Sequence, residues 1–153
     1  MAVVSETKAA DLLDTGSVHH LMGYLLAMAS VQTRRAFQHS LGTPFDLRTV
    51  EFTLLMLLLS SGGASPKQLA RTLDMPAPNV TVLVDKLVAR GLIERRRSST
   101  DGRGQRVLLT TDGLALARQA HAQSMTSEAE LLQRLSPAEQ AMLRELLLKL
   151  SRG

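Results

Sequence analysis

Apolar residues recur at helical spacing in two segments of the first 60 residues. Over residues 18–40 they stand three or four positions apart, which predicts a long first helix. Residues 47–60 are apolar at nearly every position, which predicts a buried second helix with Asp46 as its cap. The segment 41–45 between them contains Gly, Thr and Pro, and we expect it to be a connection. Residues 1–16 show no clean periodicity and are expected to fray.

Two short helices with a tight turn between them are predicted next. Ser65 is a capping hydroxyl, followed by a proline at the first helical position and a glutamine at the third, so a helix is expected from here to about Leu73. A turn with Asp74 and Pro76 leads to a fourth helix over residues 77–90, which Gly91 ends in a left-handed conformation. The inner face of this helix is predicted to carry Val80, Leu83, Val84 and Leu87. This arrangement is typical of a helix-turn-helix.

A short hairpin and two further helices complete the expected fold. Residues 92–97 and 106–109 are β-compatible, and the Gly-rich stretch between them favours a turn, which predicts a two-stranded wing. A Thr-Thr-Asp sequence at 110–112 opens a fifth helix to about Arg134, and a second capping box at 136–139 opens a sixth. The predicted fold class is mainly α with a small β-hairpin wing, a winged helix-turn-helix between N- and C-terminal helices.

The size and the apolar runs of the chain limit its class. A chain of 153 residues with 44% hydrophobic content suffices for one well-packed core, so we expect one domain. Its apolar runs fall short of the roughly 20 residues of a membrane-spanning helix. The start lacks the basic-then-apolar order of a signal peptide, so a cytoplasmic protein is expected.

Composition also narrows the chemistry. The chain has no cysteine, which excludes disulfides, thiolate zinc sites and cysteine nucleophiles. The four histidines, His19, His20, His39 and His121, show no i, i+4 pair, so no metal site and no cofactor are predicted. The sequence offers no phosphate loop, nucleophile elbow or paired-carboxylate constellation, so an enzyme is not expected.

The positive charge is concentrated in the predicted helix-turn-helix and wing. Residues 62–110 contain nine Lys or Arg against four Asp or Glu, an excess of five, whereas the whole chain has a net charge of +4. A local excess of this kind favours binding to a polyanion, because neutralised phosphates release their counterions. A solvated basic face is the alternative. With only 3% aromatic residues, duplex DNA or a protein is a better partner than single-stranded nucleic acid.

The fourth predicted helix carries polar side chains suited to a DNA groove. Asn79 is suited to pairing with adenine, Thr81 to a thymine methyl or a phosphate, and Lys86 to guanine or the backbone. Each alone is an ordinary exposed residue, and the basic hairpin that follows gives them weight. Arginines at 95, 96, 97, 103 and 106 suit a narrow minor groove. Asp101 either holds a neighbouring arginine or is a solvated turn residue.

These motifs together resemble one family of regulators. The run Asn79-Val-Thr-Val-Leu-Val-Asp-Lys-Leu-Val-Ala-Arg-Gly-Leu-Ile-Glu-Arg-Arg, then Asp101-x-Arg103, then Leu109-Thr110-x-x-Gly113, is similar to the MarR family. The order of elements matches over nearly the whole chain. The resemblance implies a homodimeric transcriptional regulator in which segments 17–40 and 111–153 form the dimer and 46–110 reads half of a palindromic operator.

The resemblance and the motifs define a set of candidate DNA-contacting residues. They are Ser65, Lys67, Ala77, Pro78, Asn79, Thr81, Val82, Lys86, Arg95, Arg97, Asp101, Arg103 and Arg106. Two positions depart from the family pattern, since Val82 replaces a polar recognition residue and Pro76 replaces a hydroxyl cap. Because valine can contact a thymine methyl, an A/T-biased site is one consequence.

The terminal helices support a dimer independently of the resemblance. The last helix has apolar residues at seam spacing, and the first is more apolar than a monomeric surface helix. The seam residues are Met142, Leu143, Leu146, Leu147 and Leu150. For any one of them, packing within the chain is an equal alternative.

The resemblance also implies control by a small aromatic acid or phenol that releases the DNA. Residues suited to lining an effector cleft are Tyr24, Met28, Arg34, Phe37, His39, Phe45, Phe52 and Met56. For the aromatic residues and methionines, plain core packing is the alternative. The predicted function is therefore a ligand-responsive repressor, with a protein-interaction module and a constitutive DNA binder as rivals.

Overall fold

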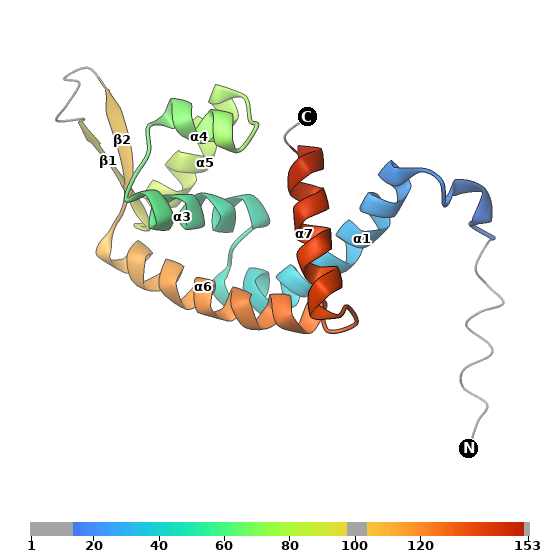
Figure 1. Ribbon diagram of the computed structural model, residues 1–153. Helices are drawn as coiled ribbons and strands as arrows, with labels where there is room; N and C mark the ends of the chain where they lie inside the picture. The colour runs from blue at the N-terminus through green and yellow to red at the C-terminus, as the bar shows by residue number, and fades with distance from the viewer. Residues whose placement is uncertain (1–13, 98–103, 152–153) are drawn as a thin grey trace. The chain divides into compact units, whose positions relative to one another are not determined.

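Helices make up most of the computed structural model, which describes residues 14–97 and 104–151. The chain divides into two compact units, one ending at Arg35 and the other beginning at Ala36 (Figure 1). The helices are η1 (Gly16–Val18), α1 (Met22–Phe37), η2 (Gln38–Gly42), α2 (Thr43–Phe45), α3 (Thr49–Ser61), α4 (Pro66–Thr72), α5 (Ala77–Ala89), α6 (Thr111–Leu131) and α7 (Pro137–Ser151). The strands are β1 (Ile93–Arg97) and β2 (Gln105–Leu109).

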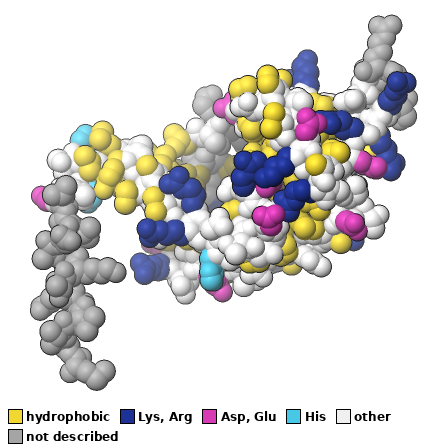
Figure 2. Space-filling model, turned by 180° about the vertical axis from the view of Figure 1, so that it is seen from behind, with side chains coloured by type: hydrophobic (Ala, Val, Ile, Leu, Met, Phe, Trp, Pro, Cys, Tyr) yellow, Lys and Arg dark blue, Asp and Glu magenta, His cyan; other side chains and the backbone are white. Residues whose placement is uncertain are grey.

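The N-terminal unit is a single helical segment with an apolar surface. Its long helix begins at Met22, four residues later than the start at Val18 that periodicity predicts. The ring of His19 stacks on Tyr24 with centroids 6.4 Å apart. Figure 2 shows hydrophobic side chains on the surface of this unit. The exposed ones are Leu21, Met22, Leu25, Leu26 and Met28.

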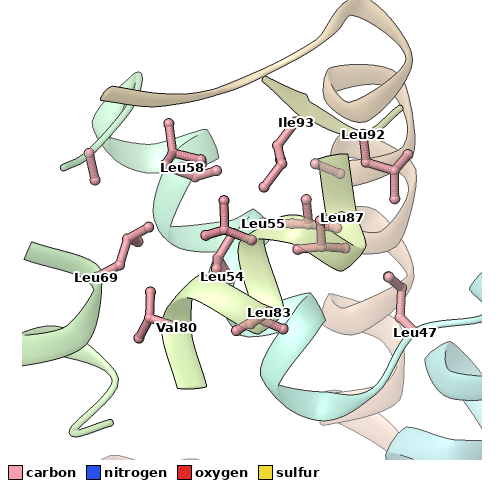
Figure 3. Packing of buried hydrophobic residues seen from close by; sticks show 14 residues of the cluster. Leu47, Leu54, Leu55, Leu58, Leu69, Val80, Leu83, Leu87, Leu92 and Ile93 are labelled. Carbon is pink, nitrogen blue, oxygen red and sulfur yellow. The ribbon is translucent and has the colours of Figure 1, made fainter. Parts of the chain in front are cut away.

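The core of the second unit lies between α3, α4, α5 and the hairpin. Leu54, Leu55 and Leu58 of α3 are at most 1% exposed and pack against α4 and α5 (Figure 3). The inner face of α5 is the predicted one, because Val80, Leu83, Val84 and Leu87 are all buried. α6 lies alongside α3 and so supports the other side of this helix (Figure 1).

The predicted wing is confirmed as an antiparallel pair of strands. Ile93 pairs with Leu109 and Arg97 with Gln105, so the return strand begins one residue earlier than expected. Val107 is fully buried, and it exchanges backbone hydrogen bonds of 3.1 and 2.8 Å with Ala64. The base of the wing is therefore fastened to the segment that precedes α4.

Local capping signals in the sequence are confirmed by geometry. The Ser65 hydroxyl accepts the Gln68 N–H at 3.2 Å, and the Gln68 side chain accepts the Ser65 N–H at 2.8 Å. Ser136 and Glu139 make the same reciprocal pair at the start of α7. Gly91 ends α5 with a φ of 70°, in the left-handed region that glycine adopts at least cost.

The segment 41–45 was expected to be a connection, and this is wrong. α1 continues into the π-helical turn η2 and then into α2, so that the backbone stays helical to Phe45. Pro44 is compatible with helix here because it lies in the first turn of α2, where its missing N–H needs no partner. The prediction that Asp46 caps the following helix, α3, is also wrong. Its φ of 49° ends α2, and Arg48 caps α3 instead.

The start of α6 makes an unusually close backbone contact. The Thr110 hydroxyl accepts the Gly113 N–H at 3.0 Å and donates to the Gly91 carbonyl at 2.6 Å. The Thr110 N–H donates to the Leu92 carbonyl at 3.1 Å. A Cβ on Gly113 would lie 1.8 Å from that same carbonyl oxygen, so only glycine fits.

The last two helices differ in how they are covered. α6 ends at Leu131, three residues before the predicted end, and buries Ala117 and Ala120. α7 buries none of its residues, although five of them form the predicted apolar seam. Within residues 14–97 and 104–151, none of the helices is long and apolar enough to cross a membrane.

Candidate nucleic-acid interface

The outward face of α5 is a compact surface of small and polar side chains. Pro78, Asn79, Thr81 and Val82 are all exposed, opposite the buried inner face. Val82 is 68% exposed, which is high for an apolar side chain in the middle of a packed helix. As the sequence predicted, Pro76 occupies the N-cap position of α5 and provides no side-chain cap. The face therefore presents methyl groups and short polar groups rather than long charged ones.

The described arginines of the wing differ in their exposure and contacts. Arg97 is exposed at the end of β1, and Figure 2 shows Lys and Arg side chains at the wing end of the unit. Arg96 pairs with Glu94 at 2.6 Å. Arg95 pairs with Asp85 of α5 at 2.6 Å and is 29% exposed. Arg106 donates to the Gly63 carbonyl at 3.0 Å. Arg95 and Arg106 thus hold the wing in place, a role that their charge alone did not reveal.

The other candidates lie around this face. Lys67 and Ala77 are exposed, whereas the hydroxyl of Ser65 is occupied as a helix cap. A pocket of about 340 Å³ separates α5 from the wing. It is lined by Pro66, Thr81, Val84, Asp85, Arg95 and Gln105. Asp101 and Arg103 lie outside the described residues.

Lys86 is exposed, and it also makes an ion pair that the sequence did not predict. Its ammonium lies 2.6 Å from a carboxylate oxygen of Glu51, whose side chain is only 1% exposed. This ion pair ties the Lys86 side chain to α3, although 48% of that side chain is exposed. Sequence reasoning missed Glu51, yet a signal was present, because Glu51 is the single charged residue within the apolar helix over 49–61.

The environment of Glu51 favours its ionised form. Burial would raise the pKa of this carboxyl, but the Arg48 N–H and the side chains of Lys86 and Arg48 all donate to it. Together they hold its pKa below the ordinary value of 4.5. Since the folded pKa is the lower one, the carboxylate stabilises the fold at any pH above 4.5. That contribution is lost as the pH falls through the folded value.

Acid is therefore expected to reduce the difference in stability between the native protein and Glu51→Gln. At neutral pH the native protein is the more stable, because glutamine leaves Arg48, Lys86 and Arg90 without their shared counter-charge. As the pH falls below 4.5 toward the lower folded pKa, the unfolded chain is protonated first, and the two free energies of unfolding converge. Urea denaturation between pH 7 and pH 3 measures this. A difference that stays constant across the range would contradict it.

The candidate effector residues fall into separate groups. Tyr24, Met28 and Arg34 belong to the N-terminal unit. In the second unit, the rings of Phe37 and Phe52 meet edge to face with centroids 5.7 Å apart. Met56 packs against the core, as the plainer interpretation of the methionines holds.

His39 and Phe45 are brought together in a pocket of about 380 Å³. Ser40, Pro44, Gln123 and Glu130 complete its lining. The pocket combines an aromatic wall with an imidazole, an amide and a carboxylate. In the part of the chain that the structure describes, three or more His, Asp or Glu side chains do not gather in a way that would hold a metal ion.

The fold and this face define a winged helix-turn-helix protein, and comparison with known proteins identifies its family. A model of the MarR family matches residues 45–104. The multiple antibiotic resistance protein MarR of Salmonella typhimurium is 31% identical over 130 residues, which cover 84% of this chain and 90% of that protein. The chain belongs to the MarR family.

Two solved structures have the same fold. The transcriptional repressor CouR, bound to a 23-mer DNA duplex, is 30% identical with a TM-score of 0.84, over 92% of this chain and 99% of that one. BpsR of Bordetella bronchiseptica, whose DNA binding is regulated by 6-hydroxynicotinic acid, is 26% identical with a TM-score of 0.78, over 86% and 94% of the two chains.

Proposed function

We propose that this MarR-family regulator is a cytoplasmic homodimeric repressor that binds a palindromic operator, with no catalytic activity. The observation that carries the proposal is the exposed face of α5 beside a wing with an exposed Arg97. In this arrangement α5 enters the major groove and the wing follows the adjacent minor groove. Two copies then read half-sites about one helical turn apart.

The dimer in this proposal is formed by residues 17–40 and 111–153, and DNA is read by 46–110. The exposed apolar side chains of α1 and α7 support this division, because a monomer rarely leaves so many of them in water. The DNA-bound form of CouR supports duplex DNA as the partner of the same fold.

We further propose that a small hydroxylated aromatic acid controls the DNA affinity. The pocket of His39 and Phe45 suits such a ligand, because Phe45 offers a ring surface, His39 a donor for a carboxylate and Glu130 an acceptor for a hydroxyl. The regulation of BpsR by 6-hydroxynicotinic acid supports this ligand class. Release of the operator requires that the ligand bind the DNA-incompetent arrangement more tightly.

Fluorescence anisotropy on genomic palindromes and scrambled duplexes tests the proposal, at several salt concentrations and with a panel of aromatic acids. Tight, salt-sensitive binding to one palindrome, weakened by one of the acids, is expected. Selective binding that none of the acids weakens would overturn the proposed control by an aromatic acid. The absence of any preference among duplexes would overturn DNA recognition and favour a protein-interaction module.

Asn79→Ala and Arg97→Ala are expected to change DNA binding in different ways. Loss of Asn79 removes a group that faces base edges, so the preferred operator sequence changes. Loss of Arg97 removes a phosphate partner, so affinity falls on all duplexes and the slope of log K against log salt decreases by about 1. Arg134→Ala, at an exposed arginine outside the wing, is the control. An unchanged salt slope for Arg97→Ala would rule out the wing contact.

A further inference from the structure

Glu51 forms a buried ionic hub between α3 and α5. Its carboxylate accepts the Arg48 N–H at 2.8 Å and the Arg48 Nε at 3.0 Å. Lys86 lies at 2.6 Å and Arg90 at 3.8 Å from its oxygens. A carboxylate that is 1% exposed would be costly to keep ionised without such partners. All four contacts converge on one carboxylate, which therefore has a defined position.

Two of the hub's cations come from α5, the helix that faces DNA in the proposed function. Lys86 and Arg90 are four residues apart in and just after α5, so both project toward Glu51 from one side of its C-terminal part. Arg90 also donates to the Asp46 carbonyl at 2.7 Å and to the Phe45 carbonyl at 3.4 Å. The C-terminal part of α5 is thus tied to the start of α3 and to the end of α2.

Within residues 14–97 and 104–151, no ion pair joins the opposite end of α5 to another element. Pro76 caps it without a side-chain hydrogen bond, and Pro78, Asn79 and Val82 are exposed there. Apolar packing of the inner face resists separation of the helices, but it is non-directional and sets rotation weakly. A helix of 13 residues is about 20 Å long, so a small rotation at the hub displaces the exposed face by more than a hydrogen bond tolerates.

We propose that Glu51 is a positioning residue for operator recognition, whose buried carboxylate sets the tilt and rotation of α5 through Lys86 and Arg90. It acts without touching DNA. This inference rests on the proposed function, because it concerns how selectively the α5 face reads a duplex. Buried ion pairs contribute little net stability compared with apolar packing, and a role in specifying one arrangement is consistent with that.

The test uses Glu51→Gln, Lys86→Met and the double variant as full-length chains. Each is assayed by anisotropy on the operator and on a scrambled duplex, at a temperature where circular dichroism shows every variant folded. Glu51→Gln is expected to weaken operator binding about tenfold, the scale of one lost base contact, while binding to the scrambled duplex is unchanged. Lys86→Met is expected to weaken operator binding by a similar factor, with an unchanged salt slope. The double variant is expected to be no worse than either single one, because both changes break one pair.

Other outcomes would overturn the inference. Additive losses, with a smaller salt slope for Lys86→Met, would make Lys86 a phosphate contact instead. Equal losses on both duplexes would mean that Glu51 only stabilises the fold. If Glu51→Gln does not fold, Lys86→Met decides alone, because it leaves Arg48 and Arg90 on the carboxylate. A native protein that prefers none of the duplexes would overturn the proposed function itself, and this inference with it.

Discussion

Gly113→Ala is expected to lower the free energy of unfolding by about 3 to 5 kcal/mol. In a helix this exchange ordinarily stabilises by up to about 1 kcal/mol, because alanine is the better helix former. Here the new Cβ would lie 1.8 Å from the Leu92 carbonyl oxygen and 2.7 Å from its carbon. Both are backbone atoms, so the clash is relieved only if α6 moves away from the strand. That movement breaks the hydrogen bond from Thr110 to Leu92.

Gly23→Ala is the matched control for this steric argument. Gly23 also lies in a helix, and a Cβ there would meet nothing within 4 Å in the isolated chain. Its replacement is expected to leave stability unchanged or slightly raised. Urea denaturation at a fixed protein concentration measures both variants. A Gly113→Ala protein as stable as the native one would disprove the close contact between α6 and Leu92.

Leu146→Glu combined with Leu150→Glu is expected to convert the protein to a monomer. The two leucines are 54% and 59% exposed in the isolated chain and lie on the apolar seam of α7. In a dimer, four leucines would lose the burial of just over half of their surface, worth roughly 3 to 7 kcal/mol in total. Four carboxylates in their place oppose association further. Operator affinity is expected to fall by about a hundredfold or more, because each half then binds alone.

Sedimentation velocity and operator anisotropy check this result together. Glu145→Gln is the control, because Glu145 forms an exposed pair with Lys149 in the same helix, and such pairs contribute little. It should remain dimeric with native affinity. A double variant that still sediments as a dimer would show that this apolar seam of α7 does not form the dimer interface. A native protein that is itself monomeric would contradict the proposed assembly.

The sequence predicted those features that depend on neighbours three or four residues away. Both capping boxes and the left-handed Gly91 are of this kind, and so is the buried face of α5. Their physics is contained in short segments, where the spacing of residue types fixes which backbone groups are satisfied.

Features that depend on distant partners were not predictable. Glu51 meets Lys86, and Arg95 meets Asp85 across elements, and spacing along the chain says nothing about such pairs. Charge alone did not reveal these pairs, and the assignment of Lys86 and Arg95 to DNA stays a prediction. The segment 41–45 failed for another reason, because Gly42 and Pro44 are typical of turns but remain compatible with the first turn of a helix.

The ion pair between Arg95 and Asp85 bears on the shape of the DNA that this protein accepts. It joins β1 to α5, so these two elements keep a constant separation. Two elements that contact DNA at a fixed separation are sensitive to the width of the groove between their contacts. An operator would fit without deformation if its minor groove is narrow at the distance from the major-groove bases that separates the wing from α5. Other duplexes would have to be bent or compressed, at an elastic cost in binding free energy. Selection by this protein would then extend to base pairs that it never touches.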